Sequence, residues 1–166
     1  MSSPQQPDRI AVIQELVHPW LAEVAKLRDV EVPGVSAQPP EVHKALVEAR
    51  GGLDRVEEIL AMAMVLRSGA EARAKELTEK ADDDLDRALV ARSARAREFE
   101  GARERLAAAS LDTLAERRAA RSAVRAADLA TSIEKRVRLH YYGLVKLRDE
   151  LADRLKHLAW ETHLDR

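Results

Sequence analysis

Hydrophobic residues recur at alternating spacings of three and four near the start of the chain. They are Ile10, Ile13, Val17, Trp20, Val24 and Leu27. This spacing places all six on one face of a helix, so it predicts an amphipathic helix that begins near Asp8, a good N-cap residue. Pro19 lies inside the pattern and has no backbone N–H. The helix is therefore expected to kink there, or to give way to a second helix that begins at Pro19.

Residues 31–40, EVPGVSAQPP, interrupt the helical pattern with three prolines and a glycine. This composition predicts a linker, after which a helix is expected to resume near Glu41. Gly51-Gly52 is a place where that helix is expected to break or bend. From Leu53 to about Ala108 there is no proline. Hydrophobic residues are densest at 53–66 and then thin to a narrow stripe, which is typical of an arm that contacts a single partner helix.

A second long helix is predicted after residues 107–113, AAASLDT, where the chain is expected to turn with Ser110 or Asp112 as a cap. Hydrophobic residues in this helix fall seven apart, with others between them. We call the following set the heptad seam: Val137, Leu144, Leu151, Leu155, Leu158 and Trp160. The spacing fits an oligomerisation surface, an intramolecular core, or a combination of the two. Gly143 is expected to mark a close helix approach or a kink.

The predicted fold class is therefore all-α: a long, coiled-coil-like antiparallel helical hairpin with N-terminal helices packed at its base. Two domains are expected. Residues 1–40 form a kinked helix and a proline-rich linker, and residues 41–166 form the hairpin and oligomerisation domain. Only 3% of the residues are aromatic, and alanine supplies much of the hydrophobic share. Because alanine buries little surface, a monomeric core would be thin, and a homo-oligomer is expected.

Composition also limits the cellular setting. The chain has no cysteine, which excludes disulfides and thiolate metal sites and fits a reducing compartment. The first residues, MSSPQQPDR, lack the hydrophobic core of a signal peptide. No hydrophobic run approaches the roughly 20 residues that span a bilayer. A cytoplasmic protein without a membrane partner is expected.

The formal net charge of −1 hides an uneven distribution. Residues 1–90 carry 11 basic and 17 acidic residues, whereas residues 91–166 carry 17 basic and 12 acidic residues. Arginine is concentrated on both sides of the predicted turn, at Arg92, Arg95, Arg97, Arg117, Arg118, Arg121 and Arg125. Arg117, Arg121 and Arg125 are four apart and share one helical face. Since the guanidinium group matches phosphate geometry, these seven are the candidate nucleic-acid-binding residues, although a charged face of a long helix can also be simply solvated.

The residue patterns of enzymes are missing. Gly51-Gly52 lacks the lysine and spacing of a phosphate loop, and no zinc-protease motif occurs. His157 and Glu161 lie four apart and could face one metal ion, but a single such pair is usually a surface pair. The acidic run at 81–87, ADDDLDR, has neither the glycine turn nor the distal carboxylate of a calcium loop. We expect a protein that is not an enzyme, with no catalytic residues, no metal site and no cofactor.

The C-terminal stretch LHYYGLVKLRDELADRLKHLAWETH, residues 139–163, resembles the end of the UvsY-type phage recombination mediators. The preceding stretch EGARERLAAASLDTLAERRAARSAVRAADLATSIEKRV is similar to their charged, alanine-rich hairpin, and the likeness covers about residues 45–166. The resemblance implies a non-enzymatic oligomer that binds single-stranded DNA and helps to load a recombinase. It also implies that the arginines bind DNA and that the heptad seam assembles the oligomer.

The alternative function is a structural or adaptor coiled-coil protein of a phage or bacterial assembly, with no affinity for nucleic acid. The two hypotheses differ in one measurable property. Contacts to phosphates release counterions, so binding to a single strand would weaken steeply as salt is raised. The adaptor hypothesis predicts a defined oligomer and no such binding.

Overall fold

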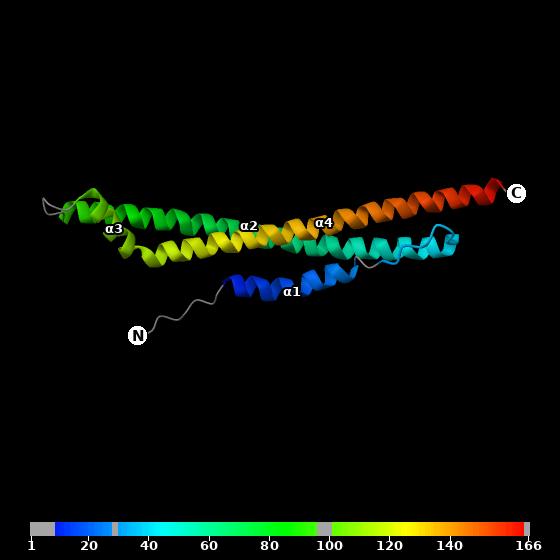
Figure 1. Ribbon diagram of the computed structural model, residues 1–166, viewed down its shortest axis with the longest axis horizontal. Helices are drawn as coiled ribbons and strands as arrows, with labels where there is room; N and C mark the ends of the chain where they lie inside the picture. The colour runs from blue at the N-terminus through cyan, green and yellow to red at the C-terminus, as the bar shows by residue number, and fades with distance from the viewer. Residues whose placement is uncertain (1–8, 28–29, 96–100, 165–166) are drawn as a thin grey trace. The chain divides into compact units, whose positions relative to one another are not determined.

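The computed structural model describes residues 9–27, 30–95 and 101–164, without the side chains of 94–95 and 161–164. Four helices make up nearly all of these ranges: α1 (Arg9–Leu27), α2 (Pro39–Arg95), α3 (Ala102–Asp112) and α4 (Leu114–Leu164) (Figure 1). No strand occurs in the ranges that the structure describes. The predicted all-α class is therefore confirmed.

The chain forms two compact units. Unit 1 comprises Met1–Ile13 and Leu66–Thr131, and unit 2 comprises Gln14–Val65 and Ser132–Arg166. This division differs from the predicted domains at 1–40 and 41–166. The reason lies in the packing of α1, because Val24 shares a hydrophobic cluster with Leu53 on α2 and Val137 on α4.

The core of unit 2 consists of two hydrophobic clusters between α2 and α4. In the central cluster, Val56 and Ile59 of α2 pack with Val137 and Leu144 of α4. In the second cluster, which we call the Val42 cluster, the start of α2 packs with Leu151. Since later residues of α2 meet earlier residues of α4, the two helices run antiparallel within this unit.

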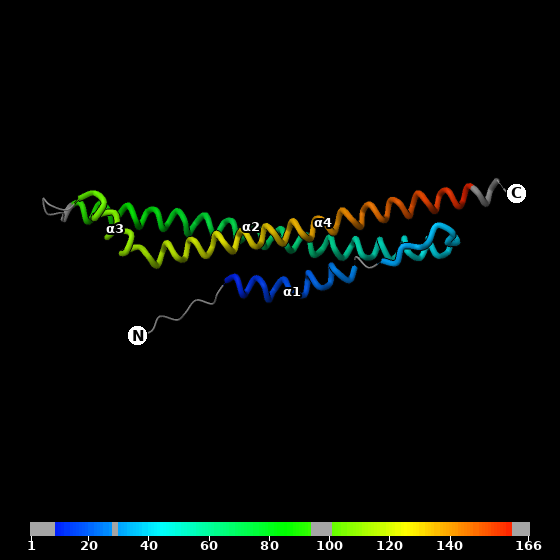
Figure 2. The backbone as a smooth tube through the Cα atoms, in the orientation of Figure 1, coloured from blue at the N-terminus to red at the C-terminus, as the bar shows by residue number. Residues whose placement is uncertain are grey.

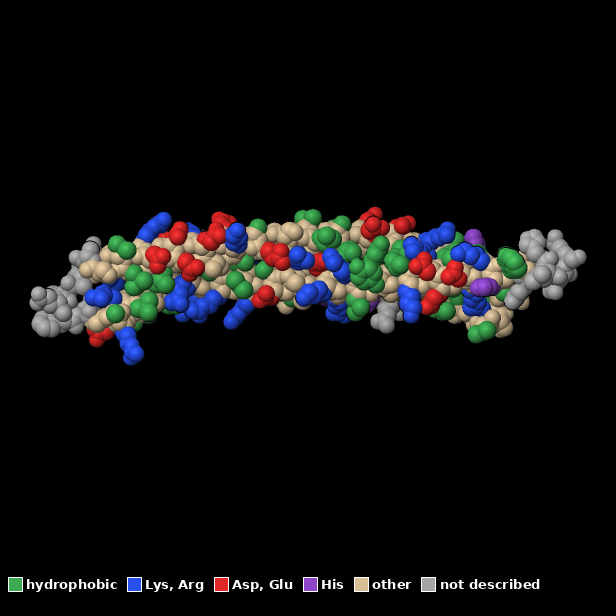
Figure 3. Space-filling model, turned by 90° about the horizontal axis from the view of Figure 1, so that it is seen from above, with side chains coloured by type: hydrophobic (Ala, Val, Ile, Leu, Met, Phe, Trp, Pro, Cys, Tyr) green, Lys and Arg blue, Asp and Glu red, His purple; other side chains and the backbone are tan. Residues whose placement is uncertain are grey.

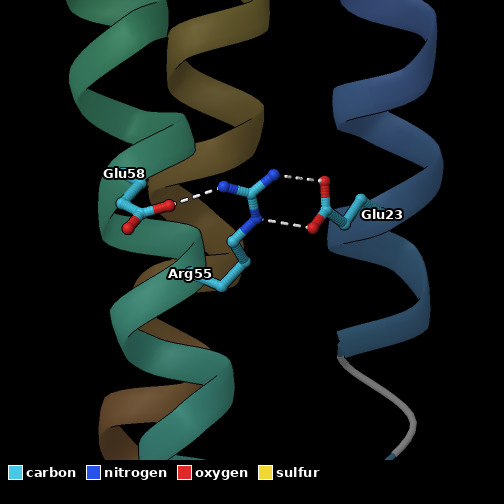
Figure 4. Close-up of polar contacts among 3 residues, drawn as sticks. All are labelled: Glu23, Arg55 and Glu58. Atoms are coloured by element: carbon cyan, nitrogen blue, oxygen red, sulfur yellow. Dashed lines mark hydrogen bonds and ion pairs between the residues drawn. The ribbon is translucent and has the colours of Figure 1, made fainter.

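Helix α1 contributes one hydrophobic face and one ionic contact to unit 2. Val24 is almost completely buried, and Trp20, Leu21 and Leu27 pack partly buried on the central cluster. The Arg55 guanidinium on α2 donates to both carboxylate oxygens of Glu23, with its Nε at 2.6 Å and its Nη2 at 3.1 Å (Figure 4). Pro19 lies inside α1, which continues past it as one helix. The expected second helix at Pro19 does not occur.

The predicted proline-rich linker is present, and α2 begins slightly earlier than expected. Pro39 and Pro40 occupy its first positions, where a missing N–H costs no helical hydrogen bond. The Gln38 N–H donates to the Glu41 carboxylate at 2.9 Å and caps this end. The Arg154 guanidinium of α4 donates to the carbonyl oxygens of Pro33, at 2.7 Å, and of Gly34, and so fastens the linker.

Helix α2 passes through Gly51-Gly52 without interruption (Figure 2), so the expected break is absent. Gly52 is buried, and a Cβ built on it would lie 3.7 Å from the Leu27 carbonyl oxygen and 3.8 Å from Leu144 Cδ1. Gly143 on α4 is exposed, and a Cβ there would meet no atom within 4 Å. It therefore marks no close helix approach among the described residues, and the other alternative, a kink, stays a prediction.

Unit 1 has an alanine core. Ala74 of α2 packs with Ala123 and Ala127 of α4, and Ala70 and Leu77 cover this cluster. An alanine side chain buries few methyl carbons, so each contact contributes little hydrophobic free energy compared with the valines and isoleucine of unit 2.

The connection between α2 and α4 contains a helix that the sequence did not predict. α3 begins after Gly101, which has an extended backbone and whose N–H donates to the Glu104 carboxylate at 3.1 Å. It ends at the buried Thr113, whose hydroxyl donates to the Ala109 carbonyl oxygen at 3.0 Å. Ser110 and Asp112, the predicted caps of the next helix, lie inside α3 instead.

Candidate nucleic-acid interface

The α4 segment of unit 1 presents a row of arginines. Arg117, Arg121 and Arg125 recur every four residues, or about 6 Å along the helix axis. They line one side of a groove of about 360 Å³ whose other side is formed by α2, including Thr78 and Asp82. Arg118 lies beside the row and is exposed. Ala120 and Ala123, which lie between these arginines, are buried, and Ala123 packs on Ala74 of α2.

The four guanidinium groups on this stretch have no counterion within the described ranges. Arg117, Arg118, Arg121 and Arg125 make no ion pair or side-chain hydrogen bond with the residues that the structure describes. Neighbouring arginines of unit 1 behave differently. Arg73 pairs with Glu76 at 2.5 Å and Arg87 with Asp84 at 3.3 Å. The α4 arginines therefore keep their hydrogen-bond donors available for an anion from outside the chain.

The other predicted arginines are not part of this row. Arg92 donates through Nε at 2.9 Å and Nη2 at 2.8 Å to one oxygen of Asp112. This contact links the end of α2 to the end of α3, so Arg92 has a structural partner. The side chain of Arg95 and the whole of Arg97 lie outside the described residues.

The α2 side of the groove carries a negative charge that affects which ligands can bind. Asp82 lines it on α2 and makes no ion pair with the described residues. A carboxylate repels phosphate, so an anion is favoured along the α4 rim and disfavoured against α2. Sequence analysis singled out the acidic run that contains Asp82 but did not place Asp82 in the same groove as the arginines. That placement depends on the register between the two helices, which alanine spacing alone leaves open.

Glu116 is a second residue whose position sequence analysis missed. Its Oε2 is buried and has no hydrogen-bond partner among the described residues. It lies in the first turn of α4, where the N-terminal end of the helix dipole favours a negative charge. Its carboxylate does not neutralise the neighbouring Arg117, which has no ion pair there.

The heptad seam is largely used inside the chain. Val137 and Leu144 are buried in the central cluster, and Leu151 is buried in the Val42 cluster. Leu155 and Leu158 pack partly buried on the Val42 cluster, whereas Trp160 is 72% exposed. For the three buried residues, the intramolecular interpretation is the one that the structure shows. Assembly of the chain into an oligomer stays a prediction.

The described residues contain no group of three or more His, Asp or Glu side chains placed to hold a metal ion. Glu161, the predicted neighbour of His157, has a side chain outside the description. Within the described part of the chain, no helix is both long and apolar enough to cross a membrane.

Both charge signs and scattered hydrophobic side chains share the face drawn in Figure 3. The arginine row is therefore a local feature and does not reflect a generally basic surface. Comparison with protein-family models, with curated proteins and with solved structures found no match. A function for this chain is therefore inferred from the residues of the site.

Proposed function

We propose that this chain is a non-enzymatic helical protein that binds single-stranded nucleic acid through the sugar-phosphate backbone. The observation that carries the proposal is the row Arg117, Arg121 and Arg125, with Arg118 beside it, whose guanidinium groups make no ion pair with the residues that the structure describes. Their spacing along α4 is similar to the distance between neighbouring phosphates of an extended strand. One helix face can therefore contact consecutive phosphates of a single strand.

The surroundings of the row favour backbone contacts over base contacts. The aromatic residues that the structure describes, Trp20, Tyr141, Tyr142 and Trp160, all belong to unit 2. Without an aromatic platform beside the arginines, bases have little to stack on. A strand bound in this way keeps its bases accessible, which is what a recombinase-loading role requires. The resemblance to recombination mediators supports DNA as the physiological strand.

Salt dependence tests the proposal directly. Three phosphate contacts to a single strand give a slope of about −2 in a plot of log K against log salt concentration. We expect a fluorescent single-stranded oligonucleotide to bind at low salt, to weaken by about this slope, and to show little preference between thymine and adenine sequences. Fluorescence anisotropy measures all three properties.

The matched variants remove the same charge from two different places. Arg117→Gln/Arg121→Gln/Arg125→Gln should abolish most of the binding. Lys26→Gln/Lys44→Gln/Arg50→Gln removes three positive charges from unit 2 and should retain it. Equal losses in the two variants would mean that the net charge, and not the arginine row, determines binding, and the proposal would be abandoned.

A second candidate function is the structural or adaptor role. The exposed hydrophobic side chains of unit 2 favour it, among them Leu139, Tyr142 and Trp160, which are 60% to 72% exposed. Absence of oligonucleotide binding at low salt, together with a defined oligomer, would select this function over the first.

A further inference from the structure

The two walls of the groove in unit 1 differ in the hydrogen bonds that they can make. On α4, the arginine row presents donors only, because a guanidinium group has no acceptor. On α2, Asp82 presents two carboxylate oxygens and makes no ion pair with the described residues. Thr78 lies one helical turn before Asp82, and its hydroxyl donates to the Ala74 carbonyl oxygen at 2.8 Å. Because that hydrogen is already used, the Thr78 oxygen is left as an acceptor, and the α2 wall presents acceptors only.

Between these walls the groove is nonpolar. Ala81 of α2 and Ala120 of α4 are buried, Val124 of α4 is 43% exposed, and all three line the groove. Its volume of about 360 Å³ is at the small end of the range for ligand sites. A site of this size and lining suits one flat heterocyclic ring, with a donor edge toward α2 and an anionic group toward α4.

We propose that the groove holds one guanine base of the bound strand, an inference that rests on the proposed function of the arginine row. The Asp82 carboxylate accepts hydrogen bonds from guanine N1–H and from its N2 amino group, while the neighbouring phosphates contact the arginines. Repulsion between Asp82 and phosphate sets this direction, because it keeps the backbone of the strand on the α4 side.

The choice of guanine follows from the acceptors on the α2 wall. Guanine is the one standard base whose Watson–Crick edge has two neighbouring donors. Adenine and cytosine place an acceptor nitrogen beside their amino group, and thymine places a carbonyl oxygen on each side of its N3–H. An acceptor that faces other acceptors loses its hydrogen bond to water and gains none in return. Thymine and adenine are both disfavoured for this reason, which agrees with the small preference expected between them.

A strand matches the length of the arginine row better than a free nucleotide does. The row extends over residues 117–125, or about 12 Å of helix. A nucleoside monophosphate has one phosphate and leaves part of the row without a partner, whereas a strand supplies several phosphates in succession. Only one base enters the groove, so the other bases of the strand stay accessible.

The first test compares three short strands of equal length by fluorescence anisotropy at low salt. One contains only thymine, one has guanine at every third position, and one has inosine in place of guanine. The guanine strand should bind about tenfold more tightly than the thymine strand, as expected for a bidentate contact to a base. Inosine lacks the N2 amino group and should lose most of this gain. Equal binding of all three strands would overturn the guanine site and leave the proposed function standing, whereas binding of none would overturn both.

The second test removes the acceptor. Asp82→Asn replaces one carboxylate oxygen by an amide NH₂ group, so it should abolish the preference for guanine without weakening the binding of the thymine strand. Asp83→Asn is the matched control. Asp83 is the next residue of α2, is also exposed and is outside the lining of the groove, so this variant should keep the preference. Loss of the preference in both variants, or in neither, would overturn the assignment of Asp82.

A competition experiment distinguishes a strand from a free nucleotide. Guanosine monophosphate, at the same concentration of guanine as the strand, should displace very little of the bound guanine strand. Displacement of half of the strand or more under these conditions would identify the groove as a site for free nucleotides and would overturn the proposal.

Discussion

Arg55 on α2 donates two hydrogen bonds to the carboxylate of Glu23 on α1. Its third nitrogen, Nη1, donates to Glu58 at 2.5 Å (Figure 4). The two-donor contact joins residues that are 32 positions apart in the sequence. A bidentate pair is specific in its geometry, so it favours one rotation of α1 about the helix axis. The nonpolar contacts of Val24 have no such directional preference.

This contact makes the stability of unit 2 depend on pH. The hydrogen bond from Arg55 is the main cause that lowers the pKa of Glu23 below its ordinary value of 4.5. A carboxyl group whose pKa is depressed in the folded state stabilises the fold above its unfolded pKa, and the stabilisation is lost as pH falls through the folded pKa. We therefore expect Glu23→Gln to unfold at a lower temperature than wild type at pH 7. The difference should disappear at a pH below the folded pKa of Glu23.

Thermal unfolding at both pH values measures the effect, which is small because the pair is solvent-exposed. Glu57→Gln is the control. Glu57 is exposed on α2, the helix that carries Arg55, and makes no ion pair with the described residues. A difference for Glu23→Gln that stays the same in acid would show that the carboxylate charge is not what stabilises the contact.

Hydrophobic spacing was sufficient to predict the helices of unit 2, because a regular three-and-four pattern of large side chains fits only one helical face. The start of α1 was predicted from the N-cap residue Asp8, and the linker from its prolines and glycine. The break at Gly51-Gly52 was not found, since packing on both sides of α2 offsets the low helix propensity of two glycines. Helix propensity is a local property of the sequence, so it does not show that packing against other helices offsets the two glycines.

The candidate site was predictable only in part. Four-residue spacing was enough to place Arg117, Arg121 and Arg125 on one face, but it could not show that Arg92 pairs with Asp112. That pairing depends on α3, which begins at Gly101 and ends at Thr113. The burial of Glu134 was likewise not predictable. Its side chain is 2% exposed and pairs with Arg138, although its sequence surroundings do not distinguish it from a surface glutamate. Burial of a charged residue is set by neighbouring helices and leaves no mark on local spacing.

The glycine pair in α2 offers a direct test of the helix through Gly51. Gly51 is exposed and a Cβ there meets nothing within 4 Å, so Gly51→Ala should stabilise the protein by about 1 kcal/mol. Gly52→Ala should also be tolerated, because the distances of 3.7 and 3.8 Å are ordinary van der Waals contacts. Urea denaturation measures both. Gly34→Ala, in the linker, should show no comparable gain, and destabilisation by Gly51→Ala would contradict the continuous helix.

The burial of Leu144 predicts a large cost for its removal. Leu144 is 4% exposed in the central cluster, so Leu144→Ala should leave a cavity and destabilise the protein by about 2–5 kcal/mol. Leu111 on α3 is 71% exposed, and Leu111→Ala should change stability very little. Urea denaturation of the two variants compares identical substitutions in opposite environments. Similar small effects would mean that Leu144 contacts solvent or another subunit.

The contrast between the two cores predicts a gradient of local stability along α2. Residues 53–60 lie in the valine and isoleucine cluster of unit 2, whereas residues 70–77 lie at the alanine cluster of unit 1. Opening a segment exposes its buried surface, and the alanine contacts bury much less of it. Amide hydrogen exchange followed by mass spectrometry should therefore be faster in peptides from 70–77 than in peptides from 53–60.

Both segments belong to one helix and lie far from its ends, so fraying affects neither, and each serves as the control for the other. Replacing Ala74 by glycine should accelerate exchange at 70–77 and leave 53–60 nearly unchanged, because the two clusters share no residue. Equal protection of the two segments in wild type would mean that unit 1 is stabilised by something beyond its alanine core.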